Sequence, residues 1–181
     1  MKKQSIKKHL KPYSIYKERK TTINNAFASA LAPNDTYNDK LIDEGLRLIG
    51  QNPDVELHCI YCNFKAETWD HLISLVKNSE LRGYGHQIGN LVPCCKSCNS
   101  KKGAKDWESF IDKNVKEENT KEELKRRLKL YLQRHAKPVD LEKIKIEMPE
   151  EWAQYLKLRE QIFELMNEAD MIAEKIRSNL F

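Results

Sequence analysis

Residues 59–62 read Cys-Ile-Tyr-Cys, and residues 95–98 read Cys-Lys-Ser-Cys. These two Cys-x-x-Cys pairs, with 32 residues between them, supply the four thiolates of a closed tetrahedral zinc site. A closed site leaves no position for substrate, so its expected role is to stabilise the fold. Cys94 makes the second pair ambiguous, and we choose Cys95 and Cys98 because they keep the spacing. The predicted ligands are Cys59, Cys62, Cys95 and Cys98.

The composition is that of a small charged protein without membrane segments. The chain has 181 residues, of which 33% are charged, enough for one main domain and an appendage. It lacks both the apolar run of a membrane span and the pattern of a secretory signal, so we expect a cytoplasmic protein without a membrane partner. All five cysteines lie between residues 59 and 98, which favours metal binding over disulfides in that compartment.

The net charge of +5 is unevenly distributed along the chain. Residues 1–20 carry eight basic side chains against one acid, Glu18, and a second basic stretch covers residues 121–137. The eight are Lys2, Lys3, Lys7, Lys8, Lys11, Lys17, Arg19 and Lys20. Such segments can neutralise phosphates by releasing counterions, although each alone is equally consistent with a solvated face. The charge pattern is therefore compatible with a nucleic-acid partner.

Hydrophobic periodicity predicts an α+β fold with helical flanks. We expect helices over residues 21–31, 37–49, 120–135 and 149–181, and short strands over 71–76 and 89–93. The corresponding division is residues 1–55 as a basic arm with helices, 56–112 as the core and 113–181 as a helical region. The last helix has heptad-spaced apolar residues from Trp152 to Leu180. This stripe is expected to pack within the molecule, with the 120–135 helix as its candidate partner; a homodimer through the C-terminal helix is the alternative.

A further set of polar residues lies between and just after the cysteine pairs. Asp70-His71 is followed by Asn90-Leu91 and then by Cys98-Asn99, with Lys102-Gly103 three residues later. This order resembles the zinc-stapled HNH nucleases, whose motif is Cys-x-x-Cys, Asp-His, Asn-Leu, Cys-x-x-Cys-Asn and Lys-Gly. The resemblance covers about residues 59–103 and implies a ββα-metal core with a structural four-cysteine zinc site.

The resemblance also implies roles for these residues. His71 would be the general base that activates water, because a histidine of near-neutral pKa suits that task. Asp70 and Asn99 would bind a catalytic Mg²⁺ or Mn²⁺, since a carboxylate and an amide oxygen suit a hard cation. Asn90 would orient the loop and the base. Adjacent strand residues point to opposite sides, so we expect a twist or bulge to bring Asp70 and His71 together.

Other residues in and near the motif depart from the family pattern or extend it. Asn99 stands where the family motif often has histidine, which makes this an HNN-like variant. His86 lies in the loop before Asn90; it is either a phosphate-contacting or catalytic group or, as we favour, an ordinary loop histidine. Lys101, Lys102 and Lys105 follow the motif and are candidates for contacts with the DNA backbone.

The resemblance implies a metal-dependent DNA endonuclease that hydrolyses phosphodiester bonds. A restriction or phage-defence enzyme fits the compact size and non-repetitive flanks best, and a homing, mobile-element or nicking nuclease is the alternative. A non-catalytic zinc module that binds nucleic acid would need none of Asp70, His71 and Asn99. A structural zinc protein that uses its C-terminal helix for partner contacts would leave the basic arm unexplained.

Overall fold

The computed structural model describes residues 3–180 and divides the chain into two compact units. One unit is continuous, from Ala28 to Glu142, and the other combines residues up to Phe27 with those from Lys143 onward. Helix α1 (Ile15–Leu31) and helix α6 (Leu141–Glu147) cross the two boundaries. These boundaries differ from the sequence-based ones at residues 55 and 112, because helices on both sides of the cysteine segment pack onto it.

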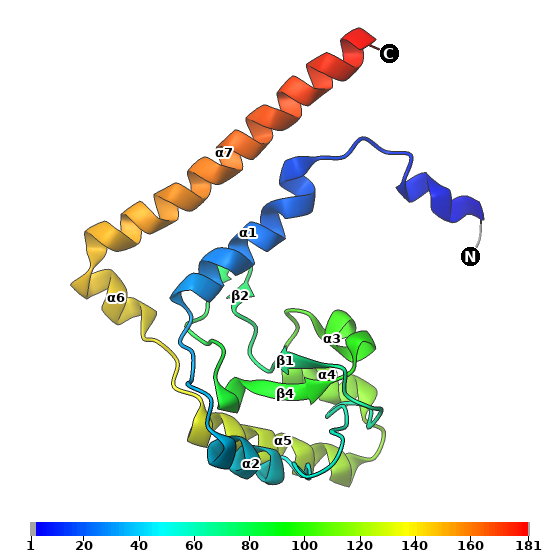
Figure 1. Ribbon diagram of the computed structural model, residues 1–181, viewed down its shortest axis with the longest axis vertical. Helices are drawn as coiled ribbons and strands as arrows, with labels where there is room; N and C mark the ends of the chain where they lie inside the picture. The colour runs from blue at the N-terminus through cyan, green and yellow to red at the C-terminus, as the bar shows by residue number, and fades with distance from the viewer. Residues whose placement is uncertain (1–2, 181) are drawn as a thin grey trace. The chain divides into compact units, whose positions relative to one another are not determined.

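The centre of the continuous unit is a two-stranded antiparallel sheet followed by a helix (Figure 1). Strand β1 (Thr68–His71) pairs with β4 (Leu91–Cys94) in continuous register, with Asp70 opposite Val92. Helix α3 (Lys96–Lys102) follows β4 directly. The chain is thus a mixed α and β protein with the ββα core that the resemblance implied.

Strand β1 ends at the residue where the sequence predicted a strand to begin. The reason is Asn90, whose side-chain amide occupies both backbone groups of Ile73: its Oδ1 accepts from Ile73 N at 2.8 Å, and its Nδ2 donates to Ile73 O at 3.0 Å. Its backbone carbonyl also accepts from Leu72 N at 2.8 Å. These hydrogen bonds replace a strand partner for Leu72 and Ile73. Apolar residues in this segment therefore mark a buried turn instead of a strand.

The segment between β1 and β4 forms a small hairpin and a short helix. Strands β2 (Val76–Lys77) and β3 (Glu80–Leu81) pair antiparallel around two residues of positive φ, Asn78 at 53° and Ser79 at 67°. This is the backbone of a tight two-residue hairpin turn. The 3-10 helix η2 (Ile88–Asn90) then leads into β4.

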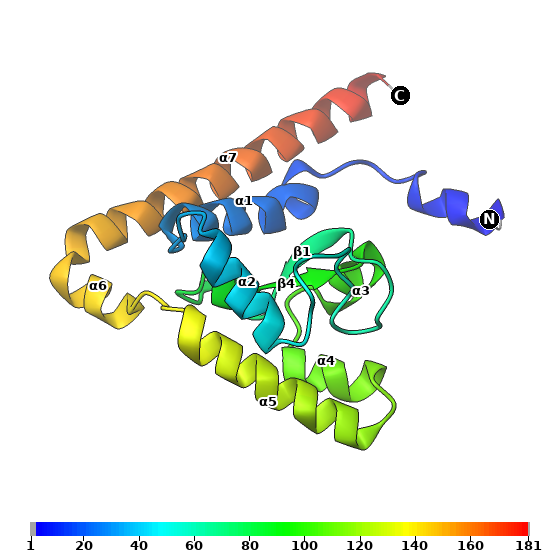
Figure 2. The same ribbon diagram turned by 60° about the horizontal axis from the view of Figure 1, so that its bottom comes forward.

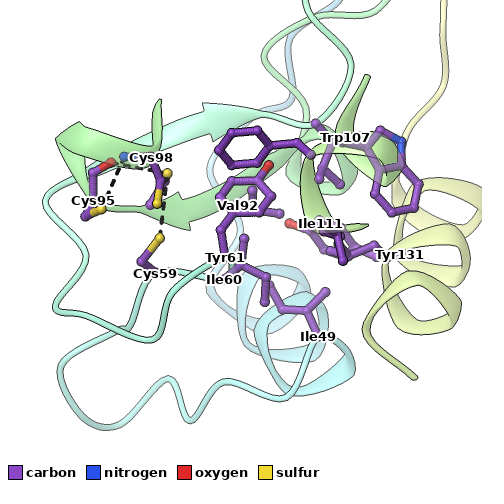
Figure 3. Close-up of a cluster of buried hydrophobic side chains, with 14 of the residues drawn as sticks. Ile49, Cys59, Ile60, Tyr61, Val92, Cys95, Cys98, Trp107, Ile111 and Tyr131 are labelled. Carbon is purple, nitrogen blue, oxygen red and sulfur yellow. Dashed lines mark hydrogen bonds between the residues drawn. The ribbon is translucent and has the colours of Figure 1, made fainter. Parts of the chain in front are cut away.

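Three helices complete the hydrophobic core of this unit: α2 (Asp39–Leu48), α4 (Trp107–Asn114) and α5 (Glu118–His135) (Figure 2). Buried apolar side chains from all three meet the sheet and the first cysteine pair (Figure 3). The rings of Tyr61 and Phe110 pack edge to face with centroids 5.0 Å apart. Tyr131 of α5 donates its hydroxyl proton towards the carbonyls of Ile88 and Leu91. The core thus fixes the strands that carry the candidate site.

The second unit contains the 3-10 helix η1 (Lys3–Lys8), most of α1, and the long helix α7 (Pro149–Leu180). Helices α1 and α7 pack antiparallel within this unit, because Tyr16 faces Phe163 while Phe27, later in α1, faces the earlier Tyr155 (Figure 1). The partner of the C-terminal helix in this unit is therefore α1, where we expected the 120–135 helix. Phe163, which lies outside the heptad stripe, is its buried residue.

The start of α1 is held by one carboxylate of α7. Asp170 accepts hydrogen bonds from the Ser14 hydroxyl at 2.7 Å and from the backbone N–H groups of Ile15 and Tyr16 at 2.7 and 3.1 Å. Free N–H groups at a helix start favour such an anionic acceptor. Among the described residues, no helix is long and apolar enough to cross a membrane.

Candidate active site and zinc cluster

The four cysteines chosen from the spacing converge in the structure. The sulfur atoms of Cys59, Cys62, Cys95 and Cys98 all lie within 4.8 Å of one another, and the Cys62 and Cys95 sulfurs are 3.7 Å apart. A tetrahedral zinc ion with Zn–S bonds of about 2.3 Å requires sulfurs about 3.8 Å apart. The thiols therefore fit a structural zinc site, which lies at one end of the core (Figure 3).

Local backbone geometry explains why each pair turns towards the same point. The first pair closes a tight turn in which Asn63 N donates to Cys59 O at 2.9 Å and Asn63 adopts a φ of 60°. The second pair starts α3: Cys95 is its N-cap, and its sulfur accepts from Cys98 N at 3.4 Å. Free N–H groups at a helix start favour negative charge, which suits a thiolate ligand there.

Cys94 lies beside the cluster without belonging to it. Its sulfur is 3.9 Å from Cys59 Sγ and donates to Cys95 O at 3.3 Å, and the residue is fully buried. The hydrogen bond shared with Cys94 lowers the pKa of Cys59 to about 4, whereas the same contact, together with burial, raises the pKa of Cys94. The converging group therefore contains Cys95 and not Cys94, as the spacing predicted.

Asp70 is a buried member of the candidate catalytic set. Its carboxylate accepts a hydrogen bond from the Tyr61 hydroxyl at 2.8 Å and lies 3.1 Å from Lys102 Nζ. The side chains of Lys102 and Asp70 are only 0% and 5% exposed. Burial raises the pKa of Asp70, while Lys102 and Tyr61 act in the opposite direction. Asp70 and Lys102 therefore form a buried ion pair at the join of β1 and α3.

This placement of Lys102 differs from the expectation that it contacts DNA. Its ammonium also donates to the backbone carbonyl of His71 at 2.6 Å, so the side chain points into the protein. A buried ammonium with carboxylate and carbonyl partners has no surface to offer a phosphate. Lys101 and Lys105, by contrast, are exposed, with Lys105 Nζ donating to Lys101 O at 2.6 Å. Lys102 therefore connects α3 to both residues of the Asp-His pair.

His71 points away from Asp70 and contacts His86. Its Nε2 is 3.1 Å from His86 Nδ1, and the two rings meet edge to face with centroids 5.0 Å apart. Burial, followed by repulsion from His86 and Lys102, lowers the pKa of His71 to about 4. The imidazole is therefore neutral at pH 7 and has a lone pair. The continuous register of β1 leaves Asp70 and His71 on opposite sides, so the bulge that we expected between them is not formed.

Asn90 and Asn99 occupy different environments. Asn90 is fully buried and joins the turn after His71 to Gly85, whose carbonyl accepts from its Nδ2 at 3.1 Å. Asn99 is half-buried on α3, and its Nδ2 is 3.4 Å from Trp69 O, one residue before Asp70. Its amide oxygen is the atom available for a cation.

Three features of the site were not anticipated from the sequence. The Tyr61 hydroxyl on Asp70 and the ion pair of Lys102 were missed, and the contact of His86 with His71 was not expected of an ordinary loop residue. Tyr61 lies between the two cysteines of the first pair, and nothing in the local sequence indicates that its hydroxyl reaches Asp70. The position of His86 depends on backbone pairing with residues far away in the chain.

The two basic stretches, residues 1–20 and 121–137, differ in how many of their charges are paired with acids. Most basic residues of α5 are paired with acids, as in the ion pairs Lys121–Glu118, Lys125–Asp112 and Lys129–Glu108. In the arm, Lys2 lies outside the described residues, while Lys3, Lys7, Lys11 and Lys17 are exposed. Lys20 instead packs over the rings of Tyr16 and Phe163. The arm therefore presents more accessible positive charge than the helix.

Comparison with protein families identifies the core. Residues 59–105 match the family model described as HNH endonuclease, and this part of the chain is an HNH domain. No curated protein and no solved structure matches the chain significantly. The match includes both cysteine pairs, the Asp-His pair and both asparagines, and leaves the helical flanks unassigned.

Proposed function

We propose that the protein is a metal-dependent DNA endonuclease that hydrolyses phosphodiester bonds. The observation that supports this most directly is the position of His71 at the end of β1, in an HNH domain whose four thiols converge as a zinc site requires; burial also lowers the pKa of His71 to about 4. A neutral imidazole can take a proton from water, and a positioned base of this kind contributes about 10²–10⁴-fold in rate.

Asp70 and Asn99 carry oxygen atoms of the kinds that a hard divalent cation binds. Asp70 and Asn99 would hold Mg²⁺ or Mn²⁺ through one carboxylate and one amide oxygen, with water and substrate as the remaining ligands. Such an ion stabilises the charge that develops on the phosphoryl group and on the leaving oxygen. The Lys102 ammonium competes with a cation for the Asp70 carboxylate. Lys102 then sets how strongly a cation is held.

The chain's own groups divide the work as follows. His71 takes the proton of the attacking water, Asn90 holds the turn that follows it, and the exposed Lys101 and Lys105 contact the DNA backbone. Lysines of the N-terminal arm add contacts that depend on charge and not on sequence. Of the biological roles, restriction or phage defence fits the small HNH core with non-repetitive flanks best; a homing, mobile-element or nicking role is the alternative.

The test is cleavage of supercoiled and linear DNA by the purified protein, with Mg²⁺ and with a chelator added after zinc loading. A restriction enzyme would give discrete fragments, and a nicking enzyme would give open circles. Asp70→Asn and Asn99→Ala should raise the Mg²⁺ concentration needed for half-maximal cleavage. Binding without Mg²⁺-dependent cutting would instead identify a zinc module that only binds nucleic acid.

We also propose a homodimer through the C-terminal helix. Leu158, Leu165 and Ile172 recur at seven-residue intervals on α7 and are 48%, 64% and 51% exposed, with Ile176 adding a further 53% exposed side chain. Regular heptad spacing suits a matching helix from a second copy of the chain. Leu165→Lys should then convert a dimer into a monomer in sedimentation measurements. A wild-type monomer at micromolar concentration would contradict the proposal.

A further inference from the structure

His86 lies within hydrogen-bond distance of His71, the candidate general base. Its Nδ1 is 3.1 Å from His71 Nε2, although His86 comes fifteen positions later in the chain. His86 itself is exposed at the surface. The contact therefore joins an exposed side chain to the half-buried imidazole proposed as the general base.

The backbone of His86 is held on both sides by a segment far away in the chain. His86 N donates to Pro33 O at 2.9 Å, and Asp35 N donates to His86 O at 3.2 Å, so residues 33–35 pair with it as in a short strand. The Asp35 side chain adds a hydrogen bond from Ile88 N at 2.8 Å. The position of His86 is thus fixed by residues outside the HNH match.

Gly85 shows how close this approach is. A Cβ atom there would collide with the backbone of Pro33, so only glycine allows the two chain segments to come together. The Gly85 carbonyl also accepts from Asn90 Nδ2 at 3.1 Å. The same asparagine that holds the turn after His71 therefore also holds the residue before His86, and the two histidines share one support.

Only one proton can lie between two neutral imidazole nitrogens. If His71 Nε2 carries it, His86 Nδ1 accepts, both rings are in the Nε2–H form, and His71 Nδ1 has a free lone pair. If His86 Nδ1 carries it, His71 Nε2 accepts, and the proton of His71 is on Nδ1. His71 then has no lone pair available for water. The tautomer of one histidine is set by the hydrogen bond that its other nitrogen makes.

We propose that His86 is a positioning residue that keeps His71 in the Nε2–H form, so that His71 Nδ1 is the atom that takes the proton of water. This inference rests on the proposed nuclease function. As the water oxygen bonds to phosphorus, its proton moves to Nδ1 and the bond from phosphorus to the 3′-oxygen breaks. The imidazolium formed on His71 donates a stronger hydrogen bond through Nε2–H to His86 Nδ1. The N-terminal flank, through residues 33–35, thereby takes part in organising the base.

The tautomer can be read directly by ¹⁵N NMR of the histidine rings in the full-length zinc-loaded protein. We expect His71 in the wild type to show a protonated Nε2 and an unprotonated Nδ1. His86→Leu should change this to a mixture of tautomers while leaving zinc content and the melting temperature unchanged. A wild-type His71 protonated on Nδ1 would overturn the proposal, whether or not the protein cuts DNA.

Two amide substitutions distinguish positioning from contact with DNA. His86→Asn places a carbonyl oxygen where Nδ1 lies and should keep the His71 tautomer and most of kcat. His86→Gln places its amide where Nε2 lies, so it should keep neither the His71 tautomer nor most of kcat. Relative to wild type, His86→Leu should lower kcat by roughly 10- to 100-fold with little change in KM. If Gln retains activity and Asn does not, or if only KM changes, His86 contacts phosphate and the positioning role is refuted.

Discussion

The four thiols of the zinc cluster converge on one point, whereas Asp70, His71 and Asn99 each bind a different partner within the protein. Both groups are carried by the same short ββα core. The thiols lie as a bound ion requires, because closing that site is part of folding. The candidate catalytic side chains are held separately, by Lys102, by His86 and by the backbone of Trp69. The thiols thus converge on one point, whereas the candidate catalytic groups are each positioned by a separate contact.

The largest effect should come from breaking the zinc end. Cys98→Ser removes a buried ligand, and because metal binding and folding are coupled in small zinc domains, the HNH core should unfold. Loss of bound zinc and of the cooperative thermal transition would be the measurements. Cys94→Ser is the matched control, since Cys94 is also buried and lies outside the cluster. If Cys94→Ser lost zinc and Cys95→Ser retained it, the ligand set would be wrong.

A smaller but still large effect is expected at the ion pair. Lys102→Met leaves the Asp70 charge buried without its partner, which typically costs about 3–5 kcal/mol in the free energy of unfolding. Adding Asp70→Asn to that variant should recover part of the loss. Chemical denaturation measures both.

Lys101→Met provides the comparison for this prediction. Lys101 is the neighbouring lysine of α3 and is exposed, so its replacement should change stability by no more than about 0.5 kcal/mol. Equal changes in the free energy of unfolding at the two positions would show that the ion pair does not stabilise the core.

The pH dependence of cleavage should reflect the lowered pKa of His71. A base acts only when deprotonated, so a pKa of about 4 keeps it active well below the 6.5 of an ordinary histidine. The acidic limb of kcat/KM should therefore lie below pH 6. The free energy of unfolding should also fall at acidic pH. His71 binds a proton more readily in the unfolded chain than in the folded protein, so stability is lost as the pH drops from about 6.5 towards 4. An acidic limb at pH 6.5 or above would indicate that His71 is not the base or is not shielded.

The smallest effect should come from the arm. Changing Lys3, Lys7 and Lys11 to Gln should weaken DNA binding and lower the slope of log K against log salt by about 0.9 for each phosphate that is no longer neutralised. The same number of changes in paired lysines of α5, at Lys121, Lys125 and Lys129, serves as the comparison. Equal slopes for the two triple variants would show that the arm has no special part in binding.

The sequence was most informative where chemistry fixes the spacing of residues. The two cysteine pairs predicted the converging thiols, and the order Asp-His, Asn-Leu and Cys-Asn predicted the HNH core that the family match confirms. The strand before Asn90 was misplaced, because hydrophobicity does not reveal that an asparagine side chain replaces the strand partner of Ile73.

Sequence patterns did not predict the contacts between segments that are distant in the chain. The pairing of His86 with residues 33–35 depends on backbone hydrogen bonds, which say little about side-chain identity; even Pro33 takes part through its carbonyl. Lys102 looked like a surface lysine because nothing local indicates that its ammonium faces Asp70. The heptad pattern of α7 did not include Phe163. Its contact with Tyr16 is made with α1, a helix from the other end of the chain that the pattern of α7 alone does not identify as the partner.

The most direct test of the central claim is the single-turnover cleavage rate of His71→Ala at saturating Mg²⁺. We expect a fall of about 10²–10⁴-fold, with zinc content, melting temperature and DNA affinity unchanged, because a general base acts on the transition state and contributes little to ground-state binding. Cleavage by His71→Ala at the wild-type rate would show that His71 is not the base and make His86 the candidate.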